Sequence, residues 1–138
     1  MIGILIITHG TLGESLIHSA SHVLNKRPQR LRPLGVTAQD DPALLLPQAR
    51  NQVEELDAGD GVLILSDMYG GTPSNMAAKL VIPGKVEAVA GVNLPMLIRV
   101  LTYRDRDLQT IVTKAISGGC EGVMRVPMFK LHNAASGN

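Results

Sequence analysis

Residues 2–10, IGILIITHG, decide the fold: they are apolar at nearly every position until the run ends at a histidine. A strand with one face in water alternates apolar and polar residues, whereas an unbroken apolar run is typical of a strand covered on both faces. Similar runs recur at residues 62–65 and 86–92. Buried strands of this kind form parallel sheets between two helix layers, so the sequence predicts an α/β protein.

Helical patterns lie between and after these strands. The first helix is amphipathic and ends near Asn25, and its apolar face is assigned to Leu12, Leu16, Ala20, Val23 and Leu24. Start signals place further helices at about 42–56, 72–80, 95–103 and 107–119. In the third helix we expect Thr72 as the cap and the following proline as the first helical residue. Pro47 lies inside the second helix, so we expect a kink or a late start there.

The remaining strand fixes the topology. Residues 31–37, LRPLGVT, are expected at a sheet edge, because Pro33 has no N–H to donate to a neighbour. With this strand outermost, the order is 2-1-3-4, and the fold is a doubly wound three-layer sandwich with a four-stranded parallel sheet. Residues 122–126, GVMRV, add one more short strand. We expect one domain over residues 1–126 and a flexible tail over 127–138.

Composition disfavours several classes of protein. The chain has 13 basic and 12 acidic residues, no block of five like charges and only 2% aromatic residues, which disfavours nucleic-acid binding. Its single cysteine, Cys120, excludes an intramolecular disulfide and a multi-cysteine metal site. We expect Cys120 to be a small buried residue in a reducing, cytoplasmic setting. The apolar start is too short for a signal peptide, and no run approaches the roughly 20 residues of a membrane span.

A histidine and an aspartate meet at the crevice that this topology creates. In open α/β sheets, ligands bind beyond the carboxyl ends of the strands, where the winding reverses. In the order 2-1-3-4 the reversal lies between strands 1 and 3, which end at His9 and Asp67. A lone histidine at a strand end is more often a satisfied polar residue than a nucleophile. Its pairing with a carboxylate reverses that expectation and favours a catalytic site.

The next stretch, MYGGTPSN at residues 68–75, adds a site for an anion. Gly70 and Gly71 let the backbone approach a ligand. The helix start beyond them offers free N–H groups together with the hydroxyls of Thr72 and Ser74. These features predict phosphoryl transfer through the imidazole, without a cofactor. The aspartate accepts the Nδ1 hydrogen in this scheme, and Nε2 of the histidine is left as the nucleophile.

Other residues carry weaker patterns. His18 and His22 are spaced like a metal pair, but they lie on the polar helix face without a recognisable third ligand, so we expect no metal site. Five residues are assigned to partner docking: Met68, Tyr69, Asn93, Leu94 and Met96. For the methionines and the tyrosine, packing in the core stays open as the alternative.

Two further functional classes fit this fold less well. A tetrapyrrole metal chelatase also has a His-Gly after strand 1, but it needs further metal ligands and a large apolar cleft. A flavodoxin-like flavin site favours a hydroxyl-rich loop after strand 1 and flanking aromatic rings. This chain has one phenylalanine, two tyrosines and no tryptophan. The GGTPSN segment argues for an anion rather than for either of these ligands.

Three motifs together resemble one protein family. They are IITHG around His9, SDMYGGTPSN at residues 66–75 and AGVNLPML at residues 90–97. In order and spacing they resemble the IIA component of the mannose family of the bacterial sugar phosphotransferase system. The resemblance covers about residues 1–126, and three motifs in register are far more specific than any one of them.

The resemblance implies a cytoplasmic phosphocarrier and a homodimer in which a short antiparallel fifth strand is exchanged between the copies. His9 would take a phosphoryl group from the phosphohistidine carrier protein HPr and pass it to a IIB protein or domain. Asp67 would orient the histidine, and Thr72 would lie near the phosphoryl group. A stand-alone regulatory phosphoprotein, whose phosphorylation state is read by a signalling partner, stays open as the alternative.

Overall fold

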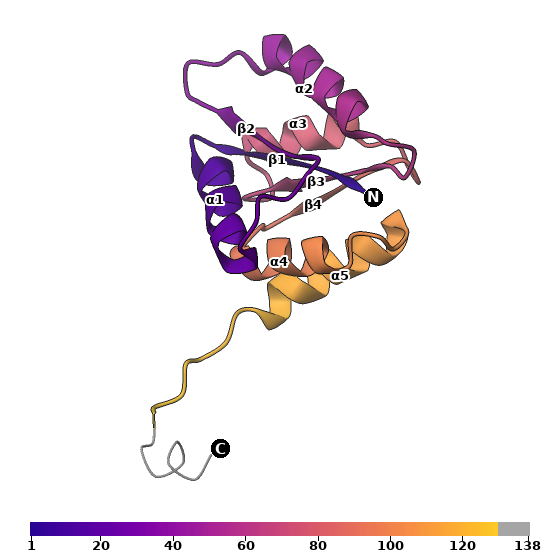
Figure 1. Ribbon diagram of the computed structural model, residues 1–138. Helices are drawn as coiled ribbons and strands as arrows, with labels where there is room; N and C mark the ends of the chain where they lie inside the picture. Colours follow the sequence, from indigo (N-terminus) through magenta and orange to yellow (C-terminus); the bar gives the residue numbers. More distant parts are fainter. Residues whose placement is uncertain (130–138) are drawn as a thin grey trace.

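The computed structural model describes residues 1–129 as a three-layer α/β sandwich (Figure 1). Four strands and five helices follow one another in the order β1 (Gly3–His9), α1 (Leu12–Leu24), β2 (Leu31–Val36), α2 (Pro42–Leu56), β3 (Val62–Ser66), α3 (Thr72–Leu80), β4 (Val86–Ala90), α4 (Leu94–Thr102) and α5 (Leu108–Glu121). The predicted α/β class is confirmed.

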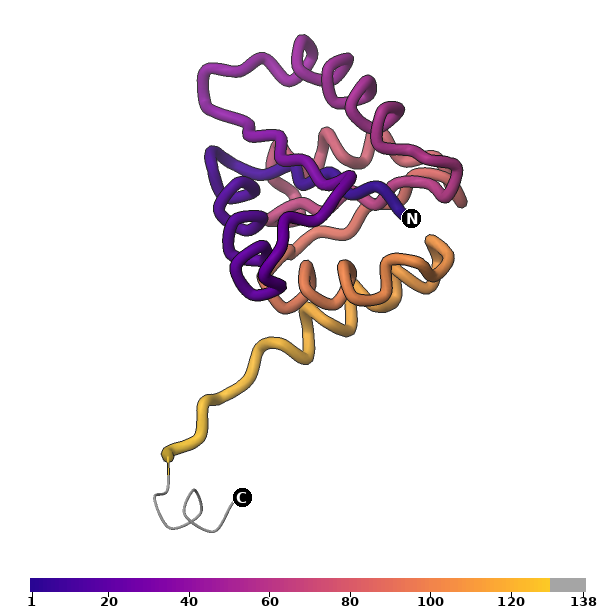
Figure 2. Tube along the Cα trace, viewed as in Figure 1, coloured from indigo at the N-terminus to yellow at the C-terminus, as the bar shows by residue number. Residues whose placement is uncertain are grey.

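All four strands are parallel, in the order β2-β1-β3-β4. Pro33 lies on the edge strand β2, opposite Ile6 of β1, so its missing N–H faces no second strand. The predicted strand order and the predicted edge position of β2 are therefore confirmed. The trace in Figure 2 shows one helix between each strand and the next, and the two helices α2 and α3 lie on the same side of the sheet.

Strand β1 is buried on both faces, as its unbroken apolar run indicates. Ile4 and Ile6 pack into a core formed with α1, α4 and α5, whereas Leu5 and Ile7 pack into a second core formed with α2 and α3. The relative exposure of all four side chains is 0%. Figure 1 shows the same division, with α2 and α3 on one side of the sheet and α4 and α5 on the other.

The face that helix α1 buries only partly matches the expected one: Ala20 is buried and Leu16 packs against the core, as expected. Its buried residues are Gly13, Ile17 and Ala20, whereas Leu12 and Val23 are exposed. A Cβ at position 13 would lie 3.3 Å from Oγ1 of Thr8 and 3.4 Å from the carbonyl oxygen of Ile6. The helix therefore approaches β1 through its glycine, and this close approach sets the rotation of the helix.

The start of α2 is confirmed, whereas the start of α3 differs from prediction by one residue. Helix α2 begins at Pro42, and the Asp41 carboxylate accepts from the Ala43 N–H. The helix continues through Pro47, so it has no late start there, which was expected as the alternative to a kink. Helix α3 begins at Thr72 and has Gly71 as its N-cap, so the expected cap position of Thr72 is wrong by one residue. Proline fits the first turn at the second helical position as well as at the first, because neither N–H has an intrahelical partner.

Residues 122–129, which follow α5, extend away from the sandwich (Figure 1). Residues 123–129 have no regular secondary structure, and the apolar side chains among them, Val123, Met124, Val126, Met128 and Phe129, are all exposed. The short strand predicted at 122–126 and its exchange across a dimer stay predictions, since a single chain offers no partner to test them. Most of the predicted tail, residues 130–138, lies outside the described residues.

Cys120 is exposed rather than buried, so that prediction is wrong. The buried side of α5 runs through Ala115, Gly118 and Gly119. One residue further along, the helix turns by about 100°. Cys120 is therefore turned away from the core by the phase of the helix.

Candidate active site

The predicted meeting of His9 and Asp67 is present in the structure. Nδ1 of the imidazole lies 2.8 Å from Oδ2 of Asp67, and the backbone N–H of His9 donates to the same oxygen at 3.0 Å. The other carboxylate oxygen accepts the N–H of Met68 at 3.0 Å. The two residues meet because the parallel strands β1 and β3 are neighbours, with Ile7 opposite Ser66. Both strands therefore end at the same edge of the sheet.

These hydrogen bonds determine the charge of the pair. Burial alone would raise the pKa of Asp67, but the backbone N–H and the imidazole of His9 outweigh it and hold that pKa below its ordinary value. Asp67 is therefore a carboxylate at neutral pH. A carboxylate accepts only, so the neutral imidazole carries its hydrogen on Nδ1 and a lone pair on Nε2. The His9 side chain is 52% exposed and that of Asp67 11%, so the ring is accessible while its partner is shielded.

Contacts that the sequence analysis did not single out hold the loop behind the ring. Thr8 is fully buried, and its hydroxyl accepts the N–H of Gly13 at 2.9 Å, which ties the end of β1 to the first turn of α1. Gly10 has φ +54 and donates its N–H to the Val36 carbonyl at 2.9 Å. A Cβ on Gly35 would lie 2.3 Å from the Gly10 carbonyl oxygen, so β2 needs a glycine there. A buried threonine beside paired glycines is the pattern that would have indicated this loop.

The glycine loop before α3 contacts the imidazole directly. A Cβ on Gly71 would lie 2.9 Å from Cε1 and 3.4 Å from Nε2 of His9, so only glycine fits beside the ring in this position. Gly70 has φ +89, a conformation that side chains rarely adopt. Helix α3 begins at Thr72, directly after Gly71, and Ser74 lies in its first turn. The positive end of a helix therefore begins next to Nε2.

The five residues assigned to partner docking separate into two groups. Met68 and Tyr69 are 60% and 87% exposed, on the loop that follows Asp67. Asn93, the half-buried Leu94 and Met96 lie at the start of α4. Met96 is 3% exposed and belongs to the core, so its assignment to docking is wrong.

The Asn93 side chain is engaged within the protein. Its Oδ1 accepts the Met96 N–H at 2.9 Å, and its amide donates to the Gly119 carbonyl at 3.2 Å. This residue therefore caps α4 and joins the helix to α5. Of the five residues, Met68 and Tyr69 are the ones whose side chains are exposed on the loop that follows Asp67.

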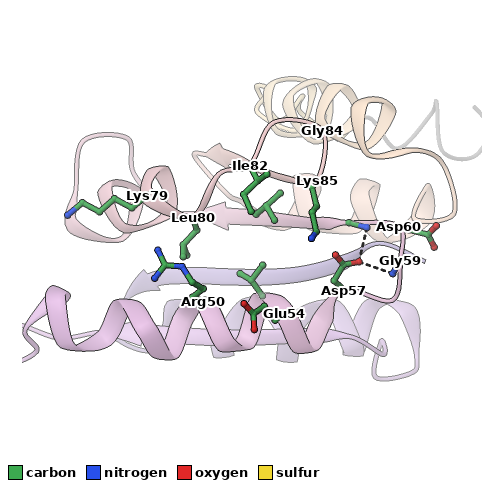
Figure 3. Close-up of a pocket in the computed structure, with 13 residues that line it drawn as sticks. Arg50, Glu54, Asp57, Gly59, Asp60, Lys79, Leu80, Ile82, Gly84 and Lys85 are labelled. Carbon is green, nitrogen blue, oxygen red and sulfur yellow. Dashed lines mark hydrogen bonds between the residues drawn. The ribbon is translucent and has the colours of Figure 1, made fainter.

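Other features of the described residues lie apart from this pair. His18 and His22 are exposed on α1, and residues 1–129 contain no group of three side chains with metal-ligand chemistry. A hollow of about 810 Å³ lies between α2 and the end of α3, lined among others by Arg50, Glu54 and Lys85 (Figure 3). It includes none of the predicted site residues. None of the helices in the described part of the chain is long and apolar enough to cross a membrane.

Comparison with known proteins gives relatives that match most of this chain. The chain is 33% identical to the "PTS system mannose-specific EIIAB component" of Escherichia coli strain K12 over 137 residues, which are 97% of this chain and 42% of the relative. The chain thus spans about two fifths of that protein. It is 28% identical to the "PTS system fructose-specific EIIA component" of Bacillus subtilis over 106 residues, covering 76% of this chain and 72% of the relative.

Solved structures agree on the fold. The mannose/sorbose specific IIA subunit of the phosphotransferase system from Enterococcus faecalis superposes with a TM-score of 0.82 at 22% identity, over 94% of this chain and 97% of that one. The family model described as "PTS system fructose IIA component" matches residues 3–116, which include both His9 and Asp67. A match over most of the chain establishes membership, and the chain belongs to the mannose family of phosphotransferase-system IIA components.

Proposed function

We propose that this protein is a phosphocarrier that accepts a phosphoryl group on Nε2 of His9 and passes it on for sugar uptake. The observation that carries the proposal is the 2.8 Å contact between Nδ1 of the half-exposed imidazole and the shielded Asp67 carboxylate. That contact leaves the Nε2 lone pair directed away from the carboxylate and accessible to a partner. Membership of a phosphotransferase family supports the same reaction class.

The transfer balances without a cofactor. As the Nε2–P bond forms on His9, the P–N bond of the donor phosphohistidine breaks and its electron pair returns to the donor ring. The Nδ1 hydrogen stays on His9, so the phosphorylated ring carries a positive charge, which the Asp67 carboxylate stabilises. The first turn of α3, with Gly70, Gly71 and the hydroxyls of Thr72 and Ser74, provides the donors for the phosphoryl oxygens.

The proposed donor is HPr, and the proposed acceptor is a IIB protein. Both partners would bring a reactive group to the exposed edge of the imidazole, next to the exposed Met68 and Tyr69. Apolar side chains in this position suit a contact with a partner protein. We infer a cytoplasmic location from this reaction, because phosphoenolpyruvate, the original phosphoryl source, is available there.

We also propose that the protein works as a homodimer over residues 1–126. Within residues 1–129, strand β4 pairs with β3, and apart from the isolated bridge between Ile82 and Val86 its outer edge is open. An apolar hollow lined by residues such as Val89, Ile116 and Val123 lies beside this edge. The exposed apolar segment 123–129 starts at the same place and suits pairing with β4 of a second copy. Light scattering should then give about twice the 14.7 kDa chain mass, and a monomer would contradict the proposal.

Radiolabelling tests the chemistry. The full chain is incubated with labelled phosphoenolpyruvate, enzyme I and HPr, and the bound label should be lost in acid and retained in base, as for a phosphohistidine. His9→Ala should abolish labelling. His18→Ala removes another exposed histidine from the same part of the molecule and should label like the wild type. Label retained on His9→Ala would refute the assignment.

The acceptor is tested separately. In the presence of a IIB protein, label should leave wild-type protein and appear on the IIB protein. The regulatory alternative predicts that His9→Glu, which places a negative charge at the same position, captures a signalling protein that wild-type protein does not. Transfer to a IIB protein without such capture favours the transport role.

A further inference from the structure

A buried guanidinium lies at the opposite end of the sheet from His9. Arg104, in the turn between α4 and α5, is only 6% exposed. Its Nε donates to the Ile2 carbonyl at 2.8 Å and its Nη2 to the Arg30 carbonyl at 2.7 Å. Within residues 1–129 it takes part in none of the ion pairs, and its Nη1 has no hydrogen-bond partner. Arg104 therefore keeps a positive charge, and the free N–H groups of Nη1 are accessible from outside.

Arg104 opens onto a small hollow with an excess of positive charge. The hollow measures about 340 Å³, and Lys26 and Arg27 also line it. Neither of these two residues is in an ion pair among the described side chains. Asp105 is the one acidic residue in the lining, so three cations face one carboxylate. Leu24 and Leu101 supply apolar wall.

The surroundings make the charge of Arg104 unfavourable as it stands. Burial lowers the pKa of Arg104 to about 10, repulsion from Arg30 adds to this, and Asp105 partly offsets it. The guanidinium is nevertheless protonated at neutral pH. A buried cation whose hydrogen-bond partners are neutral carbonyls, and which one nearby carboxylate only partly compensates, gains from a bound anion because the anion adds counter-charge.

We propose that this hollow binds a small phosphate monoester, whose phosphate group contacts Arg104, Lys26 and Arg27. A phosphate carries a charge of about −1.5 to −2 at neutral pH and three acceptor oxygens, which suits three separate cations better than one carboxylate does. The apolar side chains of Leu24 and Leu101 suit the organic part of the ester. A volume of this size accommodates such a ligand.

The site is separate from the phosphotransfer centre. Arg104 holds the carbonyl of Ile2, just before β1 begins, whereas His9 is the last residue of that strand. At about 3.3 Å per residue, the strand separates the two places by roughly 20 Å. Binding of a ligand in the hollow would therefore be a second binding function, separate from the reaction at the imidazole.

The test is a titration of the full chain with glycerol 3-phosphate, followed by amide and arginine Nε–H nuclear magnetic resonance. We expect saturable shifts at Lys26, Arg27 and Arg104, and inorganic phosphate should bind at least tenfold more weakly because it lacks the organic part. Shifts confined to residues 70–74 would place the phosphate beside His9 and overturn this proposal, while leaving the phosphocarrier role supported. Equal affinity for the two probes would overturn the assignment to a monoester.

Variants make the result specific. Arg104 is left unchanged because it holds two backbone carbonyls, so the test uses Lys26→Gln with Arg27→Gln, which should weaken glycerol 3-phosphate binding about tenfold. The matched control is Arg50→Gln with Lys85→Gln, in the hollow of Figure 3, which removes the same charge elsewhere. The control should bind like the wild type. Equal losses in both pairs would show a general charge effect and overturn the proposal.

Discussion

Replacing Gly71 with alanine tests whether the position of the imidazole controls the reaction. The added Cβ would lie 2.9 Å from Cε1 of His9, whereas ordinary van der Waals contacts begin at 3.4 Å. The backbone at this position is held, because the Gly71 N–H donates to Met68 and its carbonyl accepts from Asn75 at 2.9 Å. The ring must therefore move by roughly half an ångström or more.

That movement determines the size of the effect. The bond between Nδ1 and Asp67 is 2.8 Å long, and a shift of this order lengthens it toward the limit of a hydrogen bond. Hydrogen bonds to charged groups contribute about 1.5–3 kcal/mol. If the whole of this contribution is lost in the transition state, Gly71→Ala lowers the rate of His9 phosphorylation about 10- to 150-fold.

The assay is rapid-quench labelling by phosphorylated HPr, performed on four proteins: wild type, Gly71→Ala, Asp67→Asn and the double variant. Both single changes act on one hydrogen bond, so the double variant should be little slower than Asp67→Asn alone. A Gly71→Ala rate within twofold of wild type would refute the steric reasoning. Fully additive losses would show that the glycine acts by some route other than the contact with Asp67.

Three further predictions concern stability. The folded-state pKa of Asp67 lies below the unfolded value of 3.8, so the stability that the ionised carboxylate contributes is present above that pH and is lost as pH falls through the lowered pKa. The difference in unfolding free energy between wild type and Asp67→Asn should therefore shrink below about pH 4, as measured by urea titrations. Asn93→Ala removes the α4 cap and should cost about 1 kcal/mol by the same measurement, whereas Asn51→Ala on exposed α2 surface should cost nothing. Thr8→Val leaves the buried Gly13 N–H without its acceptor and should cost about 1–3 kcal/mol, while Thr8→Ser should retain most of that stability, and equal losses would contradict the role of the hydroxyl.

The fold was predictable because its strands carry a strong signal. A strand buried on both faces must be apolar at nearly every position, and Pro33 excludes its strand from the middle of the sheet. Once the strand order is known, the carboxyl ends of β1 and β3 must lie together, which is why the pairing of His9 with Asp67 was predictable. Both predictions depend on backbone topology and not on the packing of individual side chains.

The predictions that failed depend on side-chain packing. Cys120 is exposed although a buried position was expected, and Met96, assigned to docking with core packing as the open alternative, is buried. One residue along a helix changes the direction of a side chain by about 100°. The contact of Gly71 with the imidazole and the bond of Thr8 to Gly13 join residues whose proximity appears only after the loops are built. Sequence periodicity does not resolve details at this scale.

One oxygen of Asp67 accepts from both the backbone N–H and the ring Nδ1 of the same residue, His9. The ring is thereby fixed relative to its own main chain, and its two side-chain torsions are restricted before any partner arrives. Ordering a side chain typically costs about 0.5–1.5 kcal/mol in conformational entropy. For His9 this loss occurs once, when the chain folds, so it is not repeated at each encounter with a donor or an acceptor.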